Sequence, residues 1–150
     1  MMPKFKAFLK DTNQVLDVEI IFFELGIVKL TNNEFYEFED IILMQSTGLH
    51  DNTKFKYLSE KEQKEWLESG KTADEWQGRE IFEGDIVEHL DFNSNEISKS
   101  EVRILKGCFY LVISVDGFKY DVPMMDLKDD EYILEIKGSV HENPELLEDV

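Results

Sequence analysis

Two strand-like segments of this chain read as the two halves of one hairpin, although a long charged segment separates them. Residues 43–51 form the first half, and residues 78–87 resume the pattern of a strand. Between them the sequence changes to helix formers. The pattern indicates a strand, a turn and a strand, with a helical segment of about residues 53–77 inserted at the turn. The chain is thereby restricted to folds in which a long inserted segment connects two neighbouring strands of one β-sheet.

Short apolar runs separated by turn residues make up most of the remaining sequence. Aromatic residues account for 12% of the chain, and they favour the half-buried surface of a sheet. The pair Lys106-Gly107 lies between two apolar runs and predicts a β-hairpin. We therefore predict a mainly β fold, a small barrel or sandwich of short antiparallel strands. The predicted strands cover residues 4–9, 15–23, 27–30, 41–45, 85–90, 101–105, 108–113, 118–120 and 132–140.

The insertion carries the signals of a surface helix. Ser59 and Glu62 have the spacing of a capping box, in which each side chain bonds the other residue's backbone N–H. Gly70 suits the C-terminal end of that helix. Its apolar stripe is narrow, so we expect Trp66 and Trp76 to dock the insertion, and we regard them as candidate contacts for a partner.

The domain organisation predicted from these elements is a single domain over residues 1–150. A division into sub-lobes of residues 1–77 and 78–150 is the alternative. A short C-terminal helix is predicted to begin at Asn143-Pro144, because Asn is a good N-cap and Pro a good first helical residue.

The chain is strongly acidic, with 33 acidic and 16 basic residues and a net charge of -17. Such a surface repels phosphate backbones, so direct binding to nucleic acid is not expected. The excess of acidic residues has two interpretations. It either keeps the surface solvated, or it forms an acidic face for a basic partner, as in a protein that mimics nucleic acid. No stretch approaches the length of a membrane span. The single cysteine, Cys108, lies in an apolar run, which predicts a buried structural thiol and is consistent with a cytoplasmic protein.

The best cluster of chemically capable residues is Glu83-Gly84-Asp85. Two carboxylates around a glycine can bind a metal ion or act as acid and base. The other interpretation is structural: Gly84 allows a tight turn, and Asp85 accepts backbone hydrogen bonds at the start of a strand. We favour the structural interpretation for this turn and for Gly48, the glycine of the first hairpin half.

Other candidate sites fail on spacing. His50 and Asp51 are adjacent, and neighbours on a strand point to opposite faces, so they do not form a catalytic pair. The three histidines lack metal-ligand spacing. An acidic run near the C-terminus lacks the glycine and closing glutamate of a calcium loop; it comprises Asp126, Asp129, Asp130 and Glu131. We predict no catalytic residue, metal or cofactor.

Four blocks of the sequence carry a family resemblance: residues 4–8, 43–51, 79–87 and 136–147. In this order they span the chain, and the chain resembles the YopX-like family of phage proteins. The resemblance implies a small, mainly β protein carried by phages or prophages of low-GC Gram-positive bacteria. It implies no catalytic mechanism. The insertion at residues 53–77 departs from the family pattern.

The function predicted from these observations is a non-enzymatic protein–protein interaction or assembly module. We expect a homo-oligomer, because small β proteins must cover their edge strands. One alternative is an acidic decoy that mimics nucleic acid and blocks a DNA-handling protein. A second alternative is a weak metal-dependent hydrolase that uses Glu83 and Asp85.

Overall fold

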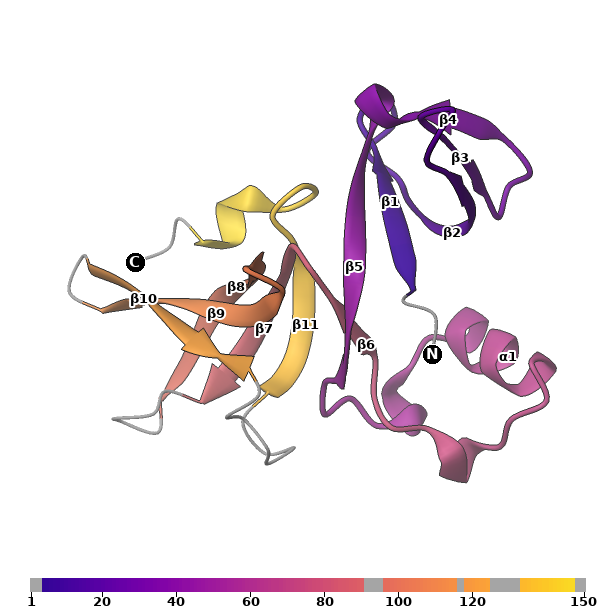
Figure 1. The fold of residues 1–150 in the computed structure, drawn as a ribbon. Coiled ribbons are helices and arrows are strands. Elements are labelled where there is room, and N and C mark those ends of the chain that lie inside the picture. Colours follow the sequence, from indigo (N-terminus) through magenta and orange to yellow (C-terminus); the bar gives the residue numbers. More distant parts are fainter. Residues whose placement is uncertain (1–3, 91–95, 116–117, 125–132, 148–150) are drawn as a thin grey trace.

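Consecutive parts of the sequence form two antiparallel sheets (Figure 1). The computed structural model describes residues 4–90, 96–115, 118–124 and 133–147. The first sheet has the strand order β4-β3-β2-β1-β5-β6, and the second β10-β9-β8-β7-β11. The strands are β1 Phe5–Leu9, β2 Val15–Phe22, β3 Ile27–Leu30, β4 Phe35–Glu37, β5 Ile41–His50, β6 Glu80–Phe82, β7 Asp85–Leu90, β8 Ile97–Leu105, β9 Cys108–Val115, β10 Phe118–Pro123 and β11 Ile133–Ser139.

The predicted mainly β fold is confirmed in its sandwich-like form. In the described residues neither sheet closes into a barrel by pairing its two edge strands. The predicted hairpin at Lys106-Gly107 joins β8 to β9, with Leu105 opposite Cys108. Lys106 and Gly107 have φ values of 51° and 80°, as a two-residue turn between right-twisted strands requires. The predicted acidic run at residues 126–131 lies outside the described residues.

Strand β1 is covered on both faces. The alternation of β1 places Ala7 and Leu9 on one face, where they are buried with Val28, Leu30 and Ile41. Phe8 points to the other face and packs with Met44 and Phe82. On that side its ring stacks on His141, with ring centroids 5.4 Å apart. His141 follows β11, so Phe8 lies at the contact between the two sheets.

Strand β2 changes partner along its length. Its first residues pair with β1, through Val15 to Asp17. A bulge between Val18 and Ile20 then bends the strand, and its last residues pair with β3 alone. Figure 1 shows β2 curving away from β1. We call the place where these two strands separate the β1–β2 fork.

The core of the second sheet also includes residues of the first. Val87, Val102, Leu111 and Met124 are buried together, and Ile81 of β6 packs among them. Ile81 is fully buried. The end of the first sheet is therefore part of the second sheet's core, and this holds the two sheets against each other.

The predicted interrupted hairpin is confirmed. Strands β5 and β6 pair antiparallel, with Ser46 opposite Phe82 and His50 opposite Glu80. The insertion leaves and returns at the end of this pair. It contains helix α1 Glu60–Glu68 between two 3₁₀ helices, Phe55–Tyr57 and Ala73–Glu75.

The predicted capping box of α1 is present at Ser59 and Glu62. The predicted C-terminal helix is the short 3₁₀ helix Pro144–Leu147, and another 3₁₀ helix, Phe38–Asp40, precedes β5. No helix in the described part of the chain is long and apolar enough to cross a membrane.

Candidate functional site

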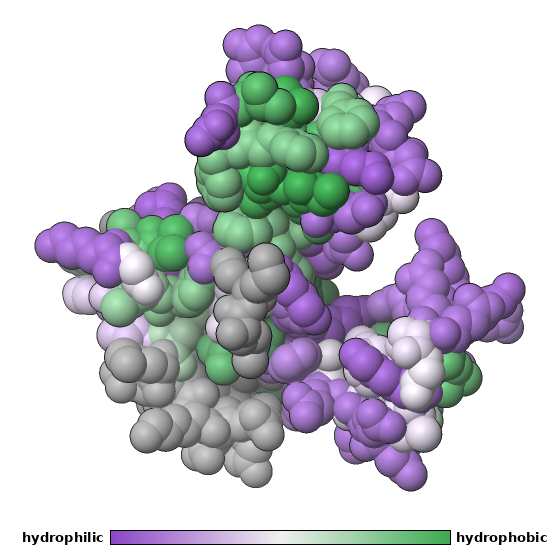
Figure 2. Space-filling view, turned by 45° about the vertical axis from the view of Figure 1, so that its right-hand side comes forward, coloured by the Kyte–Doolittle hydropathy of each residue, from purple (hydrophilic) through white to green (hydrophobic). Residues whose placement is uncertain are grey.

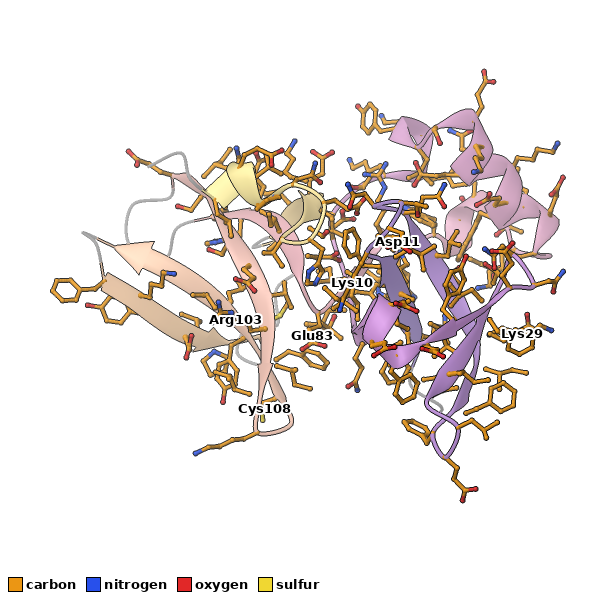
Figure 3. All side chains as sticks on the ribbon, turned by 90° about the horizontal axis from the view of Figure 1, so that it is seen from above. Lys10, Asp11, Lys29, Glu83, Arg103 and Cys108 are labelled. Atoms are coloured by element: carbon orange, nitrogen blue, oxygen red, sulfur yellow. The ribbon has the colours of Figure 1, made fainter. Side chains whose placement is uncertain are left out.

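The turn Glu83-Gly84-Asp85 connects the two sheets. Figure 3 shows Glu83 at their boundary. The Asp85 carboxylate accepts the backbone N–H of Phe82 at 2.7 Å. Gly84 has a φ of 89°, and a Cβ there would lie 2.9 Å from Nε2 of His141. Its N–H donates to the carbonyl of Val102, and its carbonyl accepts the N–H of Val140, both at 2.8 Å. This geometry is the tight turn and backbone acceptor of the structural interpretation.

Asp85 is the most perturbed carboxyl at this boundary. Burial raises its pKa to about 6, and the hydrogen bond from Phe82 and the nearby Lys6 ammonium oppose that rise. Asp85 lines a cleft of about 400 Å³, together with Lys6, Arg79 and Glu142. Glu83 is not part of that lining. The cleft therefore contains Asp85 but not Glu83, so the two carboxylates of the predicted pair do not meet in it.

Asp51 organises more of this region than any residue selected from the sequence. It is 3% exposed and directly follows β5. Its Oδ1 accepts the backbone N–H groups of Thr53 and Arg79, at 3.1 and 2.8 Å. Its Oδ2 accepts the Thr53 hydroxyl and the N–H of Ile136, both at 3.0 Å. One carboxylate thus joins β5, both ends of the insertion and β11.

Sequence reasoning weighed Asp51 only as a partner for His50. One of its hydrogen bonds could have been predicted from the sequence, because the side chain of an aspartate often accepts the backbone N–H two residues later. Here that residue is Thr53. The bond to Ile136 had no signal, since it spans 85 positions. The structure assigns Asp51 a structural role.

Gly48 lies within a strand rather than at the end of one. Strand β5 continues to His50, and its register with β6 shifts between Ser46 and His50. Gly48 has a φ of 75°, and its N–H donates to the Ser46 hydroxyl at 3.0 Å. It therefore forms a β-bulge, a feature that glycine permits at positive φ. The turn expected at Gly48 lies beyond residue 50.

Trp66 and Trp76 pack against each other inside the insertion. Their rings meet edge to face, with centroids 4.9 Å apart. The Trp66 indole N–H donates to the carbonyl of Thr72 at 2.7 Å, and that of Trp76 to the carbonyl of Thr53 at 2.8 Å. Both residues are half-buried. Their polar groups are already bonded within the insertion, so their main contribution is to hold it together.

An ion pair attaches the inserted helix to the sheet. Arg79, just before β6, donates Nε–H and Nη2–H to the Glu62 carboxylate, at 3.0 and 3.2 Å. The guanidinium hydrogen bond lowers the pKa of Glu62. Because Glu62 also completes the helix cap at Ser59, one side chain both starts α1 and anchors it.

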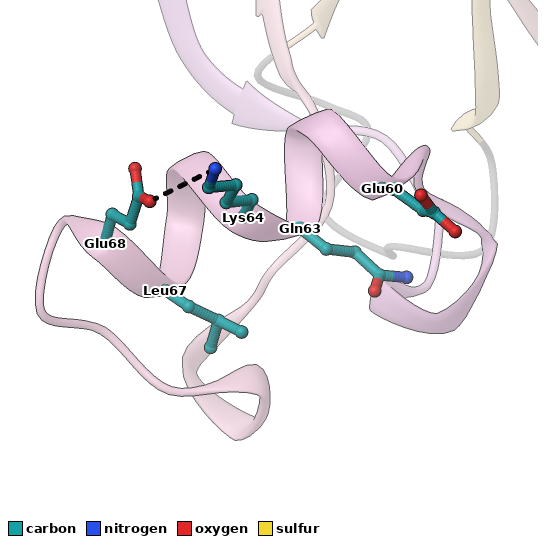
Figure 4. A pocket seen from close by; sticks show the side chains of 5 residues that line it. All are labelled: Glu60, Gln63, Lys64, Leu67 and Glu68. Carbon is teal, nitrogen blue, oxygen red and sulfur yellow. Dashed lines mark ion pairs between the residues drawn. The ribbon is translucent and has the colours of Figure 1, made fainter.

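The outer side of α1 bears a hollow of about 410 Å³ (Figure 4). Five side chains of this one helix line it, and two of them, Lys64 and Glu68, form an i,i+4 ion pair of 3.8 Å. Leu67 is its apolar member and is 50% exposed. The lining residues are Glu60, Gln63, Lys64, Leu67 and Glu68. A surface made by one solvated helix brings together no groups from other elements.

The prediction of a buried Cys108 is wrong. The thiol is exposed, and Figure 3 shows Cys108 near the tip of the β8–β9 hairpin. It directly follows the turn residue Gly107, so the apolar run that it begins is buried only farther along.

The histidines serve separate places in the structure. His89 is buried, with its Nε2 2.7 Å from the Ser100 hydroxyl. His141 stacks on Phe8, and burial lowers its pKa. His50 lies at the end of β5. No group of three His, Cys, Asp or Glu side chains in the described residues could hold a metal ion.

An apolar surface covers the outer side of β2, β3 and β4. The register places Ile20, Phe22, Ile27 and Phe35 on one face. The rings of Phe22 and Phe35 lie 6.3 Å apart, and Phe35 is 56% exposed. Figure 2 shows apolar surface gathered on the upper part of the molecule, where Figure 1 places these strands. We call these four residues the outer apolar face.

Comparison with known proteins supports the fold and a family. The crystal structure of protein EF1440 from Enterococcus faecalis matches with a TM-score of 0.56 and 22% identity, over 98% of this chain and 99% of that one. At that identity the likeness concerns the fold alone. A comparison with curated proteins gives no match.

The family model described as YopX protein matches residues 60–148. Of the four blocks that carry the resemblance, those at residues 79–87 and 136–147 lie within this range, and the two earlier blocks lie outside it. The matched range covers more than half of the sequence. The chain therefore belongs to the YopX family.

Proposed function

We propose that this protein acts by binding other protein chains rather than by catalysis, and that it assembles with copies of itself through the outer apolar face. The observation that carries this proposal is the exposure of Ile20 of β2 and Phe35 of β4 on one face of the sheet, where Lys29 of β3 lies between them. A contiguous exposed apolar patch on a soluble domain marks an interaction site.

The position of β4 adds to this support. β4 is an edge strand of the first sheet, and small β proteins must protect such edges from uncontrolled pairing. Contact between two copies through β4 and its apolar side chains would cover the edge and the face together. A closed, two-fold assembly is the simplest arrangement of this kind.

The net charge of the chain determines how self-association depends on salt concentration. Each copy has a net charge of -17, so two copies repel each other at low ionic strength. Salt screens that repulsion, with a Debye length of about 10 Å at 0.1 M, and leaves the apolar contact in place. Self-association should therefore strengthen as salt is added.

Sedimentation velocity at low and high salt tests the proposal. Phe35→Ser should shift the protein towards the monomer. Phe118→Ser is the matched control, because Phe118 is also an exposed phenylalanine, on β10 of the other sheet. A protein that is monomeric at all salt concentrations, or an assembly that survives Phe35→Ser but not Phe118→Ser, would contradict the proposed face.

A further inference from the structure

The β1–β2 fork leaves part of a strand without a neighbour. β2 pairs with β1 only through Val15, Leu16 and Asp17, whereas its pairing with β3 continues to Phe22. In the part of the chain that the structure describes, no strand pairs with the β1 side of residues 18–22. The unpaired side of a strand offers backbone N–H and C=O groups to an added strand.

A groove of about 1100 Å³ lies at this fork. It exceeds the roughly 300–1,000 Å³ of typical small-molecule sites. Its walls come from β1 and β2, and Phe82 of β6 also lines it. Most of the β2 wall is apolar, and the groove continues to Phe23, which is 74% exposed. The lining residues are Lys4, Phe5, Lys6, Asp17, Val18, Glu19, Ile20, Ile21, Phe23, Glu80 and Phe82.

The charged groups of the groove are distributed unevenly. The two lysines lie on the β1 wall, where Lys4 pairs with Glu80 at 3.5 Å and Lys6 lies over the Phe82 ring, 4.5 Å from its centroid. The β2 wall carries Asp17 and Glu19, both exposed, and Glu19 forms an ion pair of 3.5 Å with Lys29 of β3. The open strand edge is therefore flanked by carboxylates on a chain whose net charge is already -17.

We propose that the fork groove binds an extended segment of a partner protein, which adds as a strand along residues 18–22 of β2 and alternates apolar residues with lysine or arginine. In strand addition the main chain supplies affinity, while side chains at alternate positions supply specificity. Apolar side chains of the segment would meet Val18 and Ile21, which the bulge leaves on the same face of β2. Its basic side chains would meet Asp17 and Glu19.

The proposal rests on the proposed function in one respect, namely that the chain acts by binding proteins. It assigns the groove to a basic partner because a second copy would bring its own negative charge to the same acidic wall. Self-association and peptide binding then respond to salt in opposite directions. Added salt strengthens the first and weakens the second.

Synthetic peptides and the full chain provide the test. The first probe is a fluorescent peptide of about nine residues that alternates valine with lysine. The second has the same composition with its valines in one block, and the third alternates valine with glutamate. Fluorescence anisotropy should show the first peptide binding at least about tenfold more tightly than either of the others. Hydrogen exchange should show new protection in residues 18–22.

Variants locate the binding. Asp17→Asn with Glu19→Gln should weaken binding of the valine–lysine peptide roughly fivefold, in keeping with the small energies of exposed ion pairs. Asp121→Asn with Glu145→Gln is the control, because it removes the same charge from two exposed acids in the C-terminal half of the chain. The control should leave binding unchanged.

Three results would overturn the proposal: equal binding of the blocked peptide, equal weakening by the control variant, or protection that appears outside β2. Protection of the backbone N–H groups of residues 18–22 by self-assembly without peptide would also overturn it, because a second copy would then occupy the open strand edge; contact through the side chains of Ile20 and Phe22 alone would not. Failure here is distinguishable from failure of the proposed function. Loss of self-association in Phe35→Ser, measured without peptide, depends on the outer apolar face alone.

Discussion

The carboxylate of Asp51 accepts the backbone N–H of Ile136 at 3.0 Å, although the two residues are 85 positions apart. Asp51 follows the longest strand of the first sheet, and Ile136 lies on an edge strand of the second. The same carboxylate also accepts N–H groups at both ends of the insertion. A single buried side chain therefore fixes three parts of the chain relative to one another.

Replacement of Asp51 by alanine should strongly destabilise the fold. It leaves the backbone N–H groups of Thr53, Arg79 and Ile136 without their acceptor in a buried place. The expected loss in the free energy of unfolding is about 3 kcal/mol or more. Urea denaturation measures it, with Thr53→Ala as a milder comparison, expected to cost about 1 kcal/mol. An Asp51→Ala protein within 1 kcal/mol of the wild type, by the same order-of-magnitude reckoning, would refute this role.

Deletion of residues 53–77 should leave a folded protein. The Asp51 N–H donates to the carbonyl of Arg79 at 2.9 Å, so the deletion joins Asn52 to Gly78 as a two-residue loop between paired positions. Asn-Gly is a preferred sequence for such a hairpin turn. Both tryptophans are removed, so the measurement is thermal unfolding followed by far-ultraviolet circular dichroism. Loss of a cooperative transition would show that the insertion is part of the core.

Asp85 should make the protein less stable as the pH rises. Burial raises its folded-state pKa to about 6, whereas an unfolded aspartate titrates near ~3.9. The folded state therefore holds the proton more tightly, and stability falls from about pH 4 to about pH 6 and stays low above it. The loss is at most about 3 kcal/mol.

Asp85→Asn tests this, since an amide oxygen can still accept the N–H of Phe82. Relative to wild type, the variant should gain stability between pH 4 and pH 7. Asp121→Asn, which alters an exposed aspartate, is the control. A parallel pH dependence of wild type and Asp85→Asn would contradict the assignment.

Cys108 should react in the native protein. The thiol is exposed at the end of a hairpin, so a thiol-specific reagent should label one site per chain without denaturant. Cys108→Ser should change the free energy of unfolding by no more than about 0.5 kcal/mol, as for most surface substitutions. Labelling that requires urea would restore the buried-thiol interpretation.

Local sequence signals predicted the local parts of this structure. The capping box at Ser59, the hairpin at Lys106 and the interrupted β5–β6 pair all depend on residues close in sequence or on alternation within a strand. In such patterns the spacing of the residues determines the local backbone structure, so a single sequence is enough to recognise them.

The parts that were missed depend on the surroundings of a residue. The exposure of Cys108 depends on where its strand leaves the core, and the bond from Ile136 to Asp51 depends on how the sheets meet. The fork depends on a bulge in β2, which the apolar run at residues 20–23 does not reveal. These features follow from tertiary contacts, which alternation along one chain does not encode.

The chain crosses from the first sheet to the second only once among the described strands, at the turn of residues 83–84. On the ribosome, every strand of the first sheet has therefore emerged before any strand of the second. The N-terminal half can pair its strands while the C-terminal half is still being made, as domains do when they fold during synthesis. The Asp51 carboxylate is then already in place in a folded N-terminal half before Ile136 is synthesised. Its hydrogen bond to Ile136 forms only when translation is nearly complete.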